Sequence, residues 1–326
     1  MSTISPDVES EEDQTVFYFH FVFRVCLFTP LSIWSILSGS VNIIAFFKIG
    51  LRNGVNQNFF ILSIADALQG VIALCNSLCY ILEWCELHPK AVSFFVLHGL
   101  LEIAYAFPLY VSIITTTVIA LVRCLCVMMP FTVQRILTAR KQLAAILFFC
   151  GPTMVALTYV VTHVKTGFKK STVKDVRQRL FSNEAAFTLM EATRATILIG
   201  SYITIFISML FLVRALKNST GFQRQNTGSN STTVNGSSRD ARVIRGVFLV
   251  LAIFSICNFC PTFISITRFF DFGLRPLGRL SKEFVYVNIL KNFLFYVNIG
   301  GNIFVYYFNN IRFQDEVNAL LRKQTR

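Results

Sequence analysis

Seven long apolar blocks, separated by short polar connectors, constrain this chain more than any other feature. Each block holds at least 18 residues, close to the ~20 that a helix needs to cross the hydrocarbon core of a bilayer. Backbone polar groups in lipid must bond within their own segment, so each block predicts a helix. We therefore expect an all-α membrane protein, a seven-transmembrane helix bundle. The predicted spans are 25–47, 59–82, 93–128, 143–161, 196–213, 246–267 and 284–308.

The composition agrees with a chain that lies mostly in lipid. Hydrophobic residues make up 54% of the 326 residues and charged residues only 14%, whereas soluble domains carry about a quarter charged residues. The net charge of +13 would suggest nucleic acid in a soluble protein. Here Lys and Arg lie between the apolar blocks, where anionic lipid headgroups account for them. We expect the lipid bilayer as a partner and no nucleic acid.

The charge of the connectors predicts the orientation in the membrane. An odd number of spans puts the two termini on opposite sides. The connectors that share a side with the C-terminus carry 16 Lys and Arg, and the opposite set carries 13. Basic residues favour the cytoplasmic side. We therefore expect a multi-pass plasma-membrane protein with an acidic extracellular tail (1–24) and a cytoplasmic C-terminal segment (309–326).

The glycosylation sequons favour the opposite orientation. All three, at Asn218, Asn230 and Asn235, lie between the fifth and sixth spans and would be extracellular only if the N-terminus were inside. An inverted seven-helix ligand-gated channel chemoreceptor therefore remains the alternative. The stretch 218–238 is rich in Ser, Thr, Asn and Gly, where such triplets arise by chance, and it predicts a flexible linker without a fold of its own.

A short amphipathic helix is expected after the seventh span. Phe313, Val317, Leu320 and Leu321 follow one another at helical spacing, with basic residues beside them. This pattern is typical of a helix that lies on an anionic membrane surface. An ordinary solvated tail helix stays open as an alternative.

Asp66 lies about eight residues inside the second span, where a charge is expensive without a partner. Asn42, Ser112, Asn298 and Asn302 lie in other spans and also need buried partners. A carboxylate with hydroxyl and amide oxygens is a plausible site for a small hard cation or a water cluster. The alternative is that these residues only hydrogen-bond one helix to another.

The polar and proline motifs, taken in order, resemble the rhodopsin-like (class A) family of G protein-coupled receptors. They are Asn42 in GSVNIIAF, Asp66 in LSIADAL, Arg123 and Pro130 in ALVRCLCVMMPF, Pro261 in CNFCP, and Asn302 and Tyr306 in NIFVYYFNNIRF. The RCLCV segment and the short basic tail are further similar to molluscan chemosensory receptors.

The resemblance implies a receptor that passes an extracellular ligand signal to a heterotrimeric G protein and catalyses no reaction. It implies G protein coupling through Arg123, Pro130 and Tyr306, and an activation switch at Phe259 and Pro261. It also implies a sodium site formed by Asn42, Asp66, Ser112, Asn298 and Asn302, with Asp66 as the ligand of Na⁺.

The sequence departs from the family pattern at several points. Arg123 lacks the acidic neighbour that usually precedes it, because Val122 stands there. Phe259 replaces a tryptophan and Ile303 a proline. The position of the usual third-helix cysteine is His98, and 162–195 holds no cysteine, so the common disulfide to that loop is not expected.

The resemblance also excludes two ligand classes. The acid that binds amines lies 18 residues before the arginine, and Tyr105 occupies that position here. The lysine that binds retinal lies six residues before Asn302, and Tyr296 occupies it. We therefore expect neither an amine receptor nor an opsin, no retinal, and no cofactor other than a structural Na⁺.

The charged residues of the predicted outer half indicate the ligand chemistry. Glu102 and Lys291 lie there with Tyr105 and Tyr296, and the loop 163–183 carries seven His, Lys and Arg against one acid. A field of that sign attracts anions. These residues predict a site for a small organic anion or peptide, unless Glu102 and Lys291 simply pair with each other.

Overall fold

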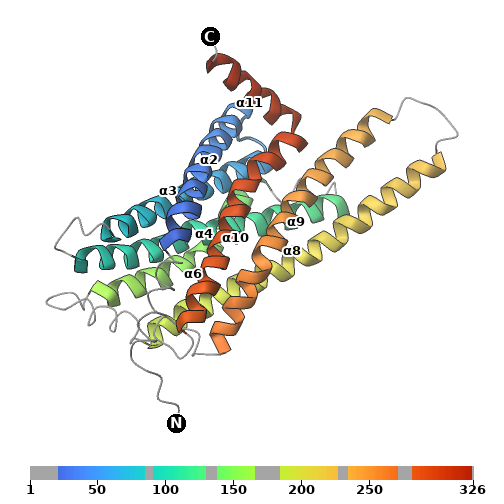
Figure 1. Cartoon of the computed structure of the whole chain (residues 1–326). Helices are drawn as coiled ribbons and strands as arrows, with labels where there is room; N and C mark the ends of the chain where they lie inside the picture. Colours follow the sequence, from blue (N-terminus) through green and yellow to red (C-terminus); the bar gives the residue numbers. More distant parts are fainter. Residues whose placement is uncertain are drawn as a thin grey trace.

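Long helices make up nearly all of the part of the chain that the computed structural model describes (Figure 1). That part comprises residues 21–84, 91–129, 138–165, 184–226, 234–270 and 281–324. The elements are η1 (Phe23–Phe28), α2 (Thr29–Ile49), α3 (Gly54–Trp84), α4 (Ala91–Met128), α6 (Ala139–Lys165), α8 (Glu184–Asn226), α9 (Val234–Phe270), α10 (Ser281–Asn309) and α11 (Ile311–Gln324). Each apolar block lies within one long helix, the first within the continuous η1 and α2. The predicted all-α bundle is confirmed.

The helices expose apolar side chains and bury polar ones, as expected for a protein surrounded by lipid. Phe148 is 75% exposed, whereas Asp66, Asn302 and Ser112 are buried. Four described segments are long and apolar enough to cross a membrane, and 251–267 is a shorter apolar helix. The four are Phe23–Ile49, Gly54–Cys79, Ile103–Cys126 and Ala192–Arg214. The chain is a multi-pass membrane protein.

Small residues allow α2 and α3 to approach closely. A Cβ placed on Gly39 of α2 would lie 2.8 Å from the Cβ of Ala67, and one on Gly70 of α3 would lie 3.0 Å from Ser35. Without a hydrophobic drive between helices in lipid, such close backbone packing is a main source of association. These contacts hold α3 against α2 at Ala67, the residue next to Asp66.

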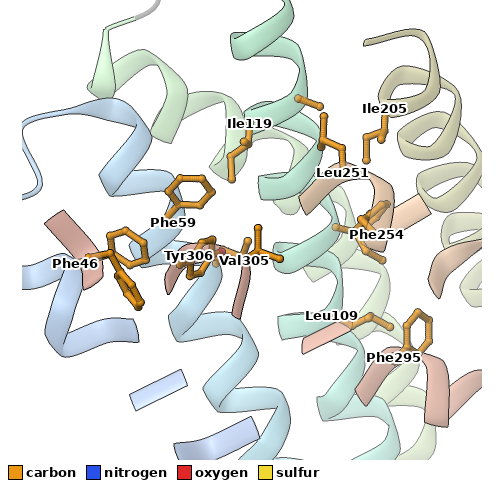
Figure 2. Packing of buried hydrophobic residues seen from close by; sticks show 14 of the residues in the cluster. Phe46, Phe59, Leu109, Ile119, Ile205, Leu251, Phe254, Phe295, Val305 and Tyr306 are labelled. Carbon is orange, nitrogen blue, oxygen red and sulfur yellow. The ribbon is translucent and has the colours of Figure 1, made fainter. Parts of the chain in front are cut away.

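A continuous apolar core runs through the bundle (Figure 2). At one end Phe46, Phe59 and Tyr306 join α2, α3 and α10. Farther along, Leu251 and Phe254 of α9 pack with residues of α4 and α8 in the same cluster. The core thus links the helices that carry the predicted site residues.

Helices α8 and α9 are longer than their apolar blocks. They project together beyond the rest of the bundle in Figure 1, because α8 continues to Asn226 and α9 begins at Val234. The prediction of a flexible linker is therefore wrong for 218–226 and 234–238, which are helical. Extending an existing helix costs far less than nucleating a new one. Residues 227–233, including the sequon at Asn230, lie outside the described part.

The predicted amphipathic helix is present as α11. Asn310 caps it, because its Oδ1 accepts a hydrogen bond from the backbone N–H of Phe313 at 3.3 Å. The expectation that its apolar face lies on the membrane is wrong for Phe313 and Val317, which are buried in the core cluster with Phe46. Only Leu321 of that face is strongly exposed, at 58%. The helix is therefore docked onto the bundle.

Candidate functional site

Asp66 joins three helices through one buried carboxylate. Its Oδ1 accepts a hydrogen bond from Ser112 Oγ on α4 at 3.1 Å, and its Oδ2 accepts one from Asn302 Nδ2 on α10 at 2.8 Å. All three residues are buried. Buried polar side chains that bond across helices hold membrane helices together, so these two contacts tie α3, α4 and α10 to one another. We call these three residues the Asp66 junction.

Two further amides are buried on α2 and α10, the helices packed beside this junction. Asn298 is buried one turn before Asn302 on α10, and Asn42 is buried one turn after Gly39, which touches the residue next to Asp66. Asn42 Oδ1 has no hydrogen-bond partner among the described residues. A buried oxygen without a partner is costly unless water or a cation meets it.

The oxygen atoms of the Asp66 junction fit a small hard cation. The carboxylate of Asp66 and the hydroxyl of Ser112 are oxygen ligands, the type that such ions prefer, and Asn42 on α2 carries a further buried amide oxygen. Na⁺ bound there would supply a positive charge to balance the buried carboxylate. The unpartnered oxygen of Asn42 is the observation that supports this fit.

Arg123 lies near the end of α4, between the buried Val122 and Cys124. Its side chain is half-buried, and its Nε has no hydrogen-bond partner within the described ranges. The following turn contains a sulfur contact of 3.8 Å between Cys124 Sγ and Met128 Sδ. Pro130, predicted to act with Arg123, lies outside the described residues.

Tyr306 is enclosed by aromatic rings rather than open to the solvent. Its ring lies 4.8 Å from Phe59, 5.2 Å from Phe46 and 5.7 Å from Phe313 between centroids. Figure 2 shows Phe46, Phe59 and Tyr306 together. Its hydroxyl has no hydrogen-bond partner in the described chain. We call these four rings the aromatic cluster.

The sequence did not reveal the aromatic cluster. The available signal was the spacing of Tyr306 and Phe313, seven residues apart on either side of a predicted helix boundary. A contact between the two also requires α11 to fold back onto α2, and the sequence pattern does not show this. In this arrangement Tyr306 is buried and held away from the surface of the bundle.

The two residues predicted as an activation switch lie apart on α9. Pro261 is buried, and its carbonyl accepts a hydrogen bond from Ser265 Oγ at 2.9 Å. Phe259 is 57% exposed and lies against the ring of Tyr202, with centroids 6.3 Å apart. The structure does not bring Phe259 to the interior. Asn258 occupies the buried position instead, and sequence reasoning missed it.

Two of the predicted ligand residues, Tyr105 and Tyr296, lie in one apolar neighbourhood. Tyr296 is buried with its ring 5.3 Å from Phe28, and the half-buried Tyr105 packs against the same cluster. Lys291 is also buried, on α10. The side chain of Glu102 lies outside the described side chains, so the structure does not test its pairing with Lys291.

The basic loop predicted to attract anions falls largely on 166–183, outside the described residues. His98 lies within α4, but its side chain is also outside the description. Eight cysteines in the described ranges are free thiols. The described geometry of the predicted ligand site therefore comes from Tyr105, Lys291 and Tyr296.

Comparison with known proteins identifies the family. The family model of the Srg family chemoreceptors matches residues 31–275, more than half of the chain. No curated protein matches the chain. The match supports a chemosensory receptor in a membrane and does not single out either rhodopsin-like or molluscan receptors. With its helical membrane bundle, this chain belongs to the Srg chemoreceptor family.

Proposed function

We propose that this chemoreceptor is a G protein-coupled receptor of the rhodopsin-like type, which transmits the binding of an extracellular chemical ligand to a heterotrimeric G protein. The observation that carries the proposal is the Asp66 junction. It joins α4 and α10, and each of these helices carries predicted ligand residues toward one end and predicted coupling residues toward the other.

The spacing along the two helices fits this division. Tyr105 and Arg123 are 18 residues apart on α4, about 27 Å at 1.5 Å per residue, nearly the thickness of a hydrocarbon core. Lys291 and Tyr306 are 15 residues apart on α10, about 22 Å. Asp66 contacts both helices between these pairs. A shift of either helix at the ligand end must therefore strain or break the junction.

The proposed mechanism is a population shift between two arrangements of the bundle. In the inactive arrangement Asn302 donates to Asp66 and Tyr306 stays in the aromatic cluster. A ligand that prefers the other arrangement moves the equilibrium only by its difference in affinity for the two. Reversing a ratio of 1:99 to 99:1 requires a preference of about 10⁴.

In this proposal the N-terminus is extracellular at the plasma membrane, and Arg123 faces the G protein. A guanidinium can donate several hydrogen bonds to carbonyls at the end of an inserted helix, where the helix dipole favours a positive charge. The Arg123→Ala receptor should therefore reach the surface and lose ligand-stimulated second-messenger production, measured in transfected cells. Arg140→Ala, on the exposed start of α6, is the matched control.

Unchanged signalling in Arg123→Ala would contradict G protein coupling through this residue. An epitope tag at the N-terminus, stained on intact cells, tests the orientation independently. Staining only after permeabilisation would contradict the proposed orientation and favour the inverted channel.

We propose that the ligand carries a carboxylate or another anionic group that binds Lys291. Lys291 is buried on α10, five residues before Tyr296, and a charge buried among membrane helices marks a candidate functional residue. Lys291→Met should weaken an anionic agonist by about tenfold or more, equal to 1.4 kcal/mol. Dose-response curves in cells measure this, with Lys48→Met as the control. An agonist that is equally potent on the native receptor and on the Lys291→Met variant would contradict the proposal.

A further inference from the structure

An apolar groove opens between η1 and α10. Its volume is about 360 Å³. Phe23 and Leu27 of η1 form one wall, and residues of α10 form the other. The residues of the second wall are Tyr286, Ile289, Leu290 and Phe293.

The local backbone explains why η1 differs from the helix that follows it. Pro30 is at the start of α2 and has no N–H to donate, so the regular ladder cannot run through it. The preceding turn is a π-helix, in which the Thr29 N–H bonds to Arg24 O. Thr29 Oγ1 donates to the same carbonyl at 3.1 Å. This wider turn forms one side of the groove, and such turns often mark functional positions.

The chemistry of the walls selects an apolar occupant. Apart from the hydroxyl of Tyr286, the lining side chains carry no polar atom, and a water molecule needs two or more polar partners to stay. The inner wall continues into a buried cluster in which Phe28, Ile289 and Tyr296 pack together. An occupant of the groove therefore meets hydrocarbon and rings.

The surroundings of the groove identify the source of the occupant. The segment Phe23–Ile49 has the length and hydropathy of a membrane span. Leu290 in the groove wall is 48% exposed, and Val297 of α10 and Leu37 of α2 are exposed apolar residues on the two helices beside it. Exposed apolar side chains face lipid in a membrane bundle, and acyl chains are the apolar groups present there at high concentration.

We propose that an acyl chain of a bilayer phospholipid occupies the groove between η1 and α10. The chain fills space that would otherwise leave the walls without contacts. It packs against the cluster that contains Tyr296 and Tyr105, and so stabilises the position of η1 on α10. The proposal does not depend on G protein coupling.

The test is photolabelling of the purified full-length receptor in nanodiscs made of phosphatidylcholine that carries a diazirine on one acyl chain. Mass spectrometry then locates the labelled residues. A held chain should label Leu27, Ile289 and Leu290 about tenfold more than Phe148 and Phe263, which corresponds to 1.4 kcal/mol of preferential binding. The two comparison residues lie on α6 and α9 and are themselves strongly exposed.

Filling the groove should remove the preference. Leu290→Trp places a ring in the groove from an already half-exposed position, and should lower labelling of Ile289 to the level of Phe148. Val297→Trp is the matched control, because Val297 is exposed on the same helix but does not line the groove. Leu27→Trp fills the groove from the opposite wall and replaces Leu290→Trp if that variant does not fold.

Three results would overturn the proposal. The first is equal labelling of the groove and of Phe148, which means that lipid contacts the groove without binding there preferentially. The second is labelling of Ile289 that persists in both tryptophan variants. The third is a photoproduct that links two receptor chains across the groove, which assigns it to a second copy instead.

Discussion

Glycines at the interface of α2 with α3 and α10 are closely packed, whereas one glycine within α6 and one within α8 are not. A Cβ on Gly39, Gly70 or Gly300 would lie within 3.0 Å of a neighbouring helix, whereas one on Gly151 of α6 or Gly200 of α8 would meet nothing within 4 Å. The first three glycines permit close backbone approach, which drives helix association in lipid. At the other two glycines a side chain would meet no neighbouring atom, so these positions do not bring two helices together.

The polar contacts show the same contrast. On the first side Asp66 accepts two hydrogen bonds from other helices. Between α8 and α9 the corresponding polar contact is Ser255 Oγ to Met209 Sδ at 3.5 Å, and a thioether is a weak acceptor. We infer that α2, α3 and α10 form a fixed frame, against which α8 and α9 rearrange at lower cost. The following predictions test this difference.

The largest effect should follow Gly39→Leu. No space exists even for its Cβ beside Ala67, so the frame must separate, and we expect a loss of more than about 4 kcal/mol and no folded receptor. Gly200→Leu, in open space, should change little. Thermal unfolding in detergent and surface expression measure both. Equal effects of the two variants would contradict the contrast between the regions.

A smaller loss should follow Phe313→Ala, which removes a fully buried ring from the aromatic cluster. We expect about 3 kcal/mol, the lower end for such truncations, because α11 can detach and the rest can stay folded. Leu321→Ala, on the exposed face of the same helix, should stay within about 0.5 kcal/mol. Thermal unfolding measures the difference. A harmless Phe313→Ala would mean that α11 is not docked.

The smallest effect concerns the junction. If Na⁺ binds at Asp66 in the inactive arrangement only, it stabilises that arrangement by mass action. Raising sodium should then weaken the agonist about tenfold, or 1.4 kcal/mol, in the native receptor and not in Asp66→Asn. Potassium at equal ionic strength is the control. If both receptors respond alike, the junction only holds the helices together.

The long apolar helices could be predicted because their signal lies in the sequence alone: a run of about 20 apolar residues has few alternatives to a membrane helix. The need of a buried charge for partners likewise pointed from Asp66 to Ser112 and Asn302, which the structure brings together. In both cases the cost of leaving a polar group without a partner in lipid restricts the outcome.

Which apolar side chains face lipid and which face the protein core could not be predicted in the same way. Lipid and protein core accept a phenylalanine equally well, so composition does not separate the exposed Phe259 from the buried Phe313. Helical periodicity is weak where both faces are apolar. Asn258 was missed because its position on α9 became interior only when the neighbouring helices were placed.

The indole of Trp34 is a fluorescent probe of the contact between α2 and α10. Its Nε1 donates to the carbonyl of Gly300 at 3.3 Å and its ring stacks on Phe304. The chain holds only two tryptophans, the other being Trp84 at the end of α3. With Trp84 replaced by Phe, the emission of the native Trp34 would report the contact of α2 with α10 directly, and a receptor could be followed in a cuvette without an attached dye.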